Sequence, residues 1–319
     1  MKTITLRPVD IERDFGQLAE LFTREQDEPT TEAGLKEDYE AHKERIIRLM
    51  VAEDETGELL GFNWATRSRF DANEVYFYII VKPEHRRQGT GSRLYDDFLQ
   101  AAKDAGVKKL QLSLRDDRPD FRSFAERRGF IQLRHTIGME LNLDSFDDKP
   151  YDVVIERVKS EGFRFTTMEE LGNTIEAQQK LYALNDTAAS ETPGSEGDHP
   201  WLSFEDFQKT VCATNWYKPD GQFVVIENST GVWAAMSAIT CFEGTDYAYN
   251  LFTGVDKTYR GRKLAQAVKV LALRYARNVL KVSTVRTTHN ALNLPMIAID
   301  RKFGYVQSPG TFRMEKILE

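Results

Sequence analysis

Apolar and polar positions follow the same order twice along the chain, and each series predicts alternating strands and helices. In the first half, an alternating run over residues 75–81 predicts a strand. Apolar residues at spacings of three and four over 94–105 then predict an amphipathic helix. A strand over 109–114 and a short helix around 121–125 follow, and Gly129 closes the series.

The second half repeats this order about 175 residues later. Strands are predicted over 247–255 and 282–287, helices over 264–275 and 292–299, and Gly304 is the closing glycine. Upstream of each series, the pattern predicts a strand, one or two helices and a β-hairpin. These elements lie at 4–7, 15–22, 35–46, 49–53 and 59–68 in the first half, and at 163–166, 175–188, 204–212, 223–227 and 232–241 in the second.

A repeat of this length predicts two tandem domains, residues 1–145 and 151–319. The total of 319 residues agrees, because it is close to twice a common domain size. The polar, acidic segment 142–150 ends in a proline and is expected to link the two domains. Residues 191–200 are expected to form a polar surface loop.

Composition narrows the class of protein. The chain has 41% hydrophobic and 29% charged residues, as soluble globular proteins do, and its net charge of −7 comes from the first half. Without a basic stripe, nucleic-acid binding is not expected. No apolar run is long enough to span a membrane and the first residues lack a secretion signal, so a cytoplasmic location is expected. Cys212 and Cys241 are too few for a disulfide framework, and the five scattered histidines suggest no metal site.

A basic, glycine-containing loop lies between the predicted strand and helix of the first half. Its sequence is Arg86-Arg87-Gln88-Gly89-Thr90-Gly91, followed by Ser92. Successive backbone N–H groups at the start of a helix form a cradle for an anion, and glycine lets a phosphate approach the main chain. The loop is neither a Walker loop nor the dinucleotide fingerprint, because the further residues of those motifs are missing.

The order strand, Arg-x-x-Gly-x-Gly, helix, strand, loop, helix and Gly-Phe resembles the acyl-CoA-dependent N-acetyltransferases of the GNAT superfamily. The second half resembles them through Arg260-Gly261-Arg262-Lys263-Leu264-Ala265 and through Asn290 and Asn293. The two copies together resemble the tandem arrangement of the mycothiol synthases. The resemblance implies an α/β (α+β) fold of two GNAT-like domains, each a mixed, mostly antiparallel sheet flanked by helices.

The resemblance also implies that acetyl-CoA is the cosubstrate and lies between splayed fourth and fifth strands. The implied donor contacts in the first copy are Ile80, Val81, Arg86, Arg87, Gln88, Gly89, Thr90, Gly91 and Ser92. Those in the second copy are Val255, Arg260, Gly261, Arg262, Lys263, Leu264, Ala265, Asn290 and Asn293. Lys263 stands at a motif glycine, which makes the second copy the weaker site.

For chemistry, the resemblance implies a carboxylate base near the fourth strand, at Glu74 or Asp246. Tyrosines alternate along the same strands, Tyr76 with Tyr78 and Tyr247 with Tyr249, and one of each set is expected to face the acceptor, with Tyr76 as the named candidate. The family's usual tyrosine acid is replaced by Ala125 and Asp300. The first hypothesis is therefore acetyl transfer to a primary amine of a small molecule or peptide. The alternatives are a catalytically degenerate acyl-CoA-binding or regulatory protein, and a transferase that takes aminoacyl-tRNA. A homodimer is left open.

Overall fold

The computed structural model describes residues 4–25 and 30–318. It divides into two compact units. Unit 1 contains the described residues up to Arg134 together with residues 311–318, and unit 2 is His135–Gly310. The boundaries therefore differ from the expected consecutive segments 1–145 and 151–319, because two short pieces of chain, residues 135–145 and 311–318, lie in the other unit.

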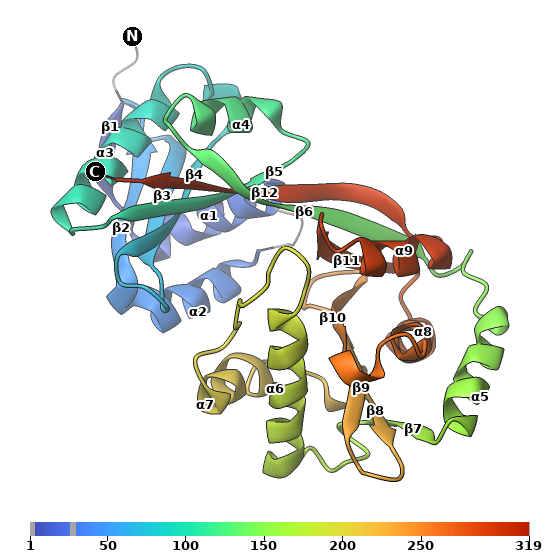
Figure 1. Ribbon diagram of the computed structural model, residues 1–319. Helices are drawn as coiled ribbons and strands as arrows, with labels where there is room; N and C mark the ends of the chain where they lie inside the picture. The colour runs from blue at the N-terminus through green and yellow to red at the C-terminus, as the bar shows by residue number, and fades with distance from the viewer. Residues whose placement is uncertain (1–3, 26–29, 319) are drawn as a thin grey trace. The chain divides into compact units, whose positions relative to one another are not determined.

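Unit 1 is built on a mixed sheet with the strand order β1-β2-β3-β4-β5-β12 (Figure 1). The strands are β1 (Thr5–Pro8), β2 (Ile46–Glu53), β3 (Leu59–Arg67), β4 (Glu74–Val81), β5 (Lys109–Arg115) and β12 (Val306–Ile317). Neighbouring strands run antiparallel except for β4 and β5, which are parallel.

Helices cover both faces of this sheet (Figure 1). They are α1 (Ile11–Glu25), α2 (Glu32–His42), α3 (Thr90–Asp104) and α4 (Pro119–Glu126). Phe15 of α1 packs with Phe62 and Trp64 on one face. Phe98 of α3 packs with Phe77 on the other face, in the cluster that also receives α4.

Unit 2 repeats this plan with the strand order β6-β11-β10-β9-β8-β7. The strands are β6 (Ile131–Asn142), β7 (Phe163–Thr167), β8 (Gln222–Glu227), β9 (Trp233–Thr240), β10 (Ala248–Val255) and β11 (Thr284–Asn290). The helices are α5 (Asp152–Ser160), α6 (Ile175–Ser190), α7 (Phe204–Phe207), α8 (Leu264–Tyr275) and α9 (Leu294–Phe303). Short 3₁₀ or π segments lie at Lys43–Arg45, Pro83–His85, Lys149–Tyr151, Gln208–Cys212, Pro219–Gly221, Lys257–Tyr259 and Ala276–Leu280.

The predicted fold class is confirmed, and the strands and helices of both repeats lie within a few residues of their predicted positions. Three elements were not predicted: β6, β12 and α5. The expected linker is also different. Leu143 and Phe146 are buried in unit 2, and Asp148 accepts hydrogen bonds from Arg274 and Arg277. This segment is therefore packed into unit 2.

Each sheet receives a strand from the other half of the sequence. In unit 1, residues 311–317 of β12 pair antiparallel with β5; in unit 2, residues 136–142 of β6 pair antiparallel with β11. Two glycines allow the backbones of β6 and β12 to approach closely within unit 2. A Cβ atom on Gly138 would lie 2.2 Å from the Pro309 carbonyl oxygen, and one on Gly310 would lie 2.0 Å from that of Thr136.

The parallel strands at the centre of each unit separate soon after they begin. β4 and β5 pair only from Glu74↔Lys109 to Tyr76↔Gln111. β10 and β11 pair only at Ala248↔Val285 and Tyr249↔Arg286. Beyond these positions no strand among the described residues pairs with the inner edge of β4, which opens a gap in the sheet next to the N-terminus of α3.

Candidate functional site

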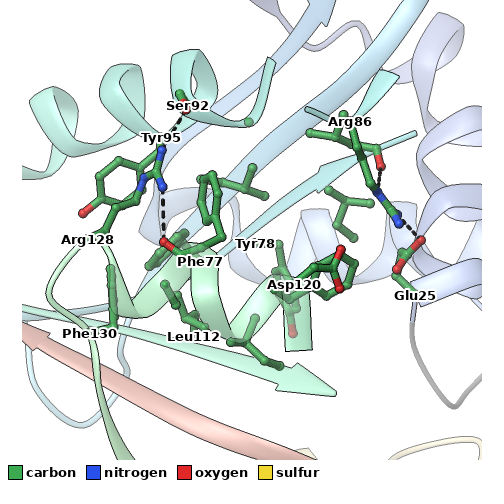
Figure 2. A pocket seen from close by; sticks show the side chains of 18 of the residues that line it. Glu25, Phe77, Tyr78, Arg86, Ser92, Tyr95, Leu112, Asp120, Arg128 and Phe130 are labelled. Atoms are coloured by element: carbon green, nitrogen blue, oxygen red, sulfur yellow. Dashed lines mark hydrogen bonds and ion pairs between the residues drawn. The ribbon is translucent and has the colours of Figure 1, made fainter. Parts of the chain in front are cut away.

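A cavity of about 460 Å³ opens where β4 and β5 separate (Figure 2). Ile80 and Val81 line it from β4, and Leu112 and Leu114 line it from β5. The β4–α3 loop and α4 complete its walls. The cavity is therefore bounded by both separated strands, as a groove for an extended chain would be.

The β4–α3 loop presents unpaired backbone donors at the start of α3. Arg87 and Gly89 both adopt positive φ angles, 60° and 93°. The N–H groups of residues 87–91 form no hydrogen bond with any part of the chain that the structure describes. A Cβ on Gly89 would meet no protein atom within 4 Å, so the space beside it is open. This arrangement can bind a phosphate group through the main chain and the helix dipole.

The side chain of Arg86 supports this loop from behind. Its Nε donates to the Val81 carbonyl oxygen at 2.9 Å, and its Nη2 donates to Glu25 Oε1 at 2.5 Å. Arg118 forms a second ion pair with Glu25, at 3.3 Å. Arg86 thus ties the loop to the end of α1. Because its guanidinium already bonds to Val81 and Glu25, we assign it a structural role in the loop.

The predicted catalytic side chains of unit 1 lie at the closed end of the strand pair. Glu74 is buried and pairs with Lys109, with 3.5 Å between Oε2 and Nζ. The hydroxyl of Tyr76 accepts a hydrogen bond from Arg313. Neither residue lines the cavity, which begins at Phe77 on this strand.

Two further polar side chains line the cavity: Tyr78, which the strand alternation offers beside Tyr76, and Asp120, which the sequence analysis missed. Tyr78 lines it from β4. The residue is 41% exposed, but the atoms packed around its ring partly desolvate the hydroxyl and raise its pKa above the usual range, so the hydroxyl is protonated at neutral pH. Asp120 lines it from the first turn of α4. Strand alternation groups Tyr78 with Tyr76, and only the point at which the strands separate distinguishes them.

Unit 2 has a smaller cavity, of about 390 Å³, beside the equivalent loop. Gly261 and Lys263 adopt positive φ angles there, 82° and 62°. The N–H groups of 261–265 also bond to no described residue. Arg260 pairs with Glu191 at 2.5 Å, as Arg86 does with Glu25 in unit 1. The loop geometry is therefore conserved between the two units although the glycine position has changed.

The other predicted residues of unit 2 lie in different surroundings. Asn293 lines the smaller cavity. The side-chain amide of Asn290 donates to the Gly194 carbonyl oxygen at 2.8 Å, which ties the 191–200 loop to β11. Asp246 is exposed in the turn before β10 and does not line the cavity.

The deeper part of unit 2 holds a buried charged cluster. Lys269 Nζ lies 2.5 Å from Asp300 Oδ1, and both side chains are fully buried. His289 Nε2 lies 2.6 Å from the other oxygen of Asp300. Burial lowers the pKa of Lys269. Burial opposes ionisation of Asp300, but Lys269 and His289 outweigh it and hold the pKa of the carboxyl below its usual range.

The same cluster distinguishes the two units. At the repeat offset, His289 corresponds to Leu114, Lys269 to Tyr95 and Asp300 to Ala125. These three counterparts line the cavity of unit 1, whereas the clustered residues do not line that of unit 2. The cluster occupies the positions that border open space in the first unit.

Two further searches covered only the described part of the chain. No helix there is both long and apolar enough to cross a membrane. No group of three or more His, Cys, Asp or Glu side chains among the described residues is arranged to hold a metal ion.

Comparison with known proteins gives consistent matches. Residues 15–130 match the Acetyltransferase (GNAT) family. A mycothiol acetyltransferase from Saccharopolyspora erythraea is 23% identical over 236 residues, covering 71% of this chain and 72% of the relative.

Two solved structures share the fold along nearly the whole chain. A tandem GNAT protein from the clavulanic acid biosynthesis pathway aligns with a TM-score of 0.74 at 17% identity, covering 99% of this chain and 98% of that one. A GCN5-related N-acetyltransferase from Sphaerobacter thermophilus aligns with a TM-score of 0.71 at 17% identity, covering 98% and 95%.

Proposed function

We infer that the chain is an acyltransferase of tandem fold related to the GNAT acetyltransferases, whose family residues 15–130 match. From this premise we propose that it transfers an acetyl group from acetyl-CoA, the acyl donor of this family, to a primary amine of a small molecule or peptide. The donor site is assigned to unit 1. The observation that carries the proposal is the open cavity between β4 and β5, with unpaired N–H groups of residues 87–91 at one end.

The residues present fit such a donor. Acetyl-CoA supplies an activated thioester, whose carbonyl carbon accepts an amine. The N–H groups of residues 87–91 would hold the pyrophosphate, and the space beside Gly89 admits it. Ile80 and Val81 would border the pantetheine arm.

The unpaired edge of β4 provides a hydrogen-bond donor that would stabilise the negative charge developing on the thioester carbonyl oxygen. The N–H of Lys82 bonds to Leu60 on β3. Because antiparallel partners alternate along a strand, Ile80 also bonds toward β3, and Ile79 turns its N–H toward the gap. A main-chain donor held rigidly in a sheet stabilises an oxyanion without reorganising.

Two side chains are proposed to move protons. Among the described residues, two carboxylates line the cavity, Glu25 and Asp120. Glu25 pairs with Arg86 at 2.5 Å and with Arg118 at 3.3 Å. The ion pair of Asp120 with Arg118 is longer, at 3.9 Å, so Asp120 would accept the proton of the incoming ammonium. Tyr78 would protonate the leaving thiolate. The hydroxyl of the other cavity-lining tyrosine, Tyr95, is engaged by Lys316 at 3.3 Å.

Isothermal titration with acetyl-CoA tests the donor and its location together. We expect one site per chain, with Gly89→Trp abolishing it because a bulky side chain fills the phosphate cradle. Lys263→Trp, at the same loop position of unit 2, is the matched control and should leave binding unchanged. Binding that survives Gly89→Trp but is lost in Lys263→Trp would place the donor in unit 2 and overturn the assignment.

A screen of primary amines for thiol release then tests the acceptor. Release of CoA thiol that depends on the amine supports acetyl transfer. Donor binding without release on any amine would favour the alternative of a degenerate acyl-CoA-binding protein, for which the replacement of the family's tyrosine by Ala125 is the motivating observation.

A further inference from the structure

The cavity of unit 1 is lined by more cations than its carboxylates neutralise. Its arginines are Arg86, Arg87, Arg115, Arg127 and Arg128. Arg86 pairs with Glu25, and Arg115 pairs with Asp117. The other three form no ion pair with any residue in the described parts of the chain. Unpaired cations at a cavity in a chain of net charge −7 indicate an anionic ligand.

Arg128 is held in a fixed position at one end of this cavity (Figure 2). Its guanidinium lies 3.5 Å from the ring centroid of Phe124. Nη2 donates to Ser92 Oγ at 2.8 Å, and Nη1 donates to the Phe124 carbonyl oxygen at 3.1 Å. A guanidinium has five N–H groups. The remaining three donate to nothing in residues 4–25 or 30–318.

Arg128 has favourable contacts with the Phe124 ring and carbonyl oxygen, but part of its surroundings is unfavourable for a cation. Arg128 follows α4, whose C-terminal end attracts cations, but its side chain reaches Ser92 in the first turn of α3. The N-terminal end of a helix carries partial positive charge and repels a cation. Burial adds to this cost by lowering the pKa of Arg128. An anion between the guanidinium and the helix end would remove the repulsion.

A second polar group at the same helix end also has no partner. Thr90 is the first residue of α3 and is 1% exposed. Its Oγ1 forms no hydrogen bond within the described chain. Unit 2 lacks this arrangement. At the repeat offset Thr90 corresponds to Leu264, Ser92 to Gln266, and Arg128 to Phe303, which packs against Phe146.

Acetyl-CoA carries two separate anionic groups, a pyrophosphate bridge and a phosphate monoester on the ribose 3′ oxygen. The backbone N–H groups of residues 87–91 account for the first. We propose that Arg128, with Arg127 beside it, binds the 3′-phosphate and makes the site selective for 3′-phosphorylated CoA. Arg128 is then a specificity-determining residue, because an arginine fork grips a phosphate through two parallel hydrogen bonds. This inference rests on the proposed function, since it concerns the same donor.

The test compares two ligands that differ only in this phosphate. Dissociation constants of CoA and of 3′-dephospho-CoA are measured by isothermal titration on the full chain and on Arg128→Ala. The unmodified chain should bind CoA about 10- to 100-fold more tightly than dephospho-CoA. Arg128→Ala should lose most of this preference by weakening CoA binding, while its affinity for dephospho-CoA changes by less than about 3-fold.

Arg122→Ala is the matched control, because Arg122 lies on α4, the helix that Arg128 follows, pairs with Glu126 and does not line the cavity. It should leave both affinities and their ratio unchanged. Circular dichroism of each variant checks that it folds, and Arg128→Lys provides a variant that keeps the charge while losing the fork. We expect Arg128→Lys to retain only part of the preference for CoA.

Each other outcome has a definite meaning. An equal loss of both ligands in Arg128→Ala would assign Arg128 to the pyrophosphate and overturn the inference while leaving the proposed function intact. An unchanged ratio with a lower thermal midpoint would show a structural role, and would also overturn it. If the unmodified chain bound neither ligand, the proposed function itself would fail, and this inference with it.

Discussion

At the scale of single residues, the two tyrosines of β4 have different surroundings, and only one of them borders the cavity. Tyr78 lines the cavity, while the Tyr76 hydroxyl accepts a hydrogen bond from Arg313. Both belong to one alternating strand and point to the same face. What distinguishes them is that β5 leaves β4 after Tyr76. A side chain placed two residues further along therefore borders open space.

Replacing Tyr78 with phenylalanine tests its role as the proton donor to the leaving thiolate. We expect kcat for amine acetylation to fall about 100-fold, near the lower end of general acid catalysis. Because partial desolvation raises the pKa of Tyr78, the unmodified enzyme should keep this contribution from neutral pH up to the ordinary tyrosine range and lose it only above that range. Steady-state rates from pH 6 to pH 10 measure both effects.

Tyr76→Phe provides the comparison, because Tyr76 is the tyrosine that the sequence analysis named as the candidate. A larger loss in Tyr76→Phe than in Tyr78→Phe would show that the acid lies at the closed end of the strand pair, contrary to our assignment.

The position of the β4–α3 loop could be predicted from the sequence alone, since Gly89 and its neighbours precede a helix with a clear apolar stripe. The role of Arg86 could not, because its partner Glu25 lies 61 residues away.

At the scale of secondary-structure elements, β6 and β12 are the part of the fold that periodicity did not provide. Ile137, Met139 and Leu141 are buried at alternate positions of β6, so a strand could have been predicted. The strand with which β6 pairs could not have been predicted. β6 pairs with β11 across more than a hundred residues of chain. A local pattern specifies that a segment is a strand but does not specify which sheet edge receives it.

The close approach of β6 and β12 gives an element-scale prediction. Gly310→Ala should destabilise the protein by about 1–3 kcal/mol, because the added Cβ would lie 2.0 Å from a backbone oxygen that has little room to move. Gly16→Ala in α1 is the control. There the nearest atom is the end of the Glu32 side chain, at 3.2 Å, and alanine favours the helix by up to about 1 kcal/mol. Urea unfolding measures the stability of both variants. Unchanged stability in Gly310→Ala would contradict the close approach of β6 and β12.

At the scale of the whole molecule, one structural plan has been kept in two units while its interior has diverged. Both units have a loop with two positive φ angles, strands that separate early, and an arginine tied to a glutamate at the C-terminal end of the long helix α1 or α6. Unit 1 leaves the space between these strands open. Unit 2 places the pair formed by Lys269 and Asp300 at the corresponding positions. This difference supports assigning the donor site to unit 1.

The cluster makes a prediction about stability that does not depend on catalysis. Asp300→Leu leaves the Lys269 ammonium buried without its carboxylate, and should cost about 3–5 kcal/mol. Adding Lys269→Met to Asp300→Leu removes the unpaired charge, so the double variant should return to within about 1 kcal/mol of the unmodified protein. Urea unfolding followed by circular dichroism gives these values, and the affinity for acetyl-CoA should stay constant because the cluster lies in unit 2. If Asp300→Leu alone did not lower the stability, Lys269 and Asp300 would not form the buried ion pair that distinguishes unit 2 from unit 1. A loss of acetyl-CoA affinity in the double variant would show that unit 2 takes part in donor binding.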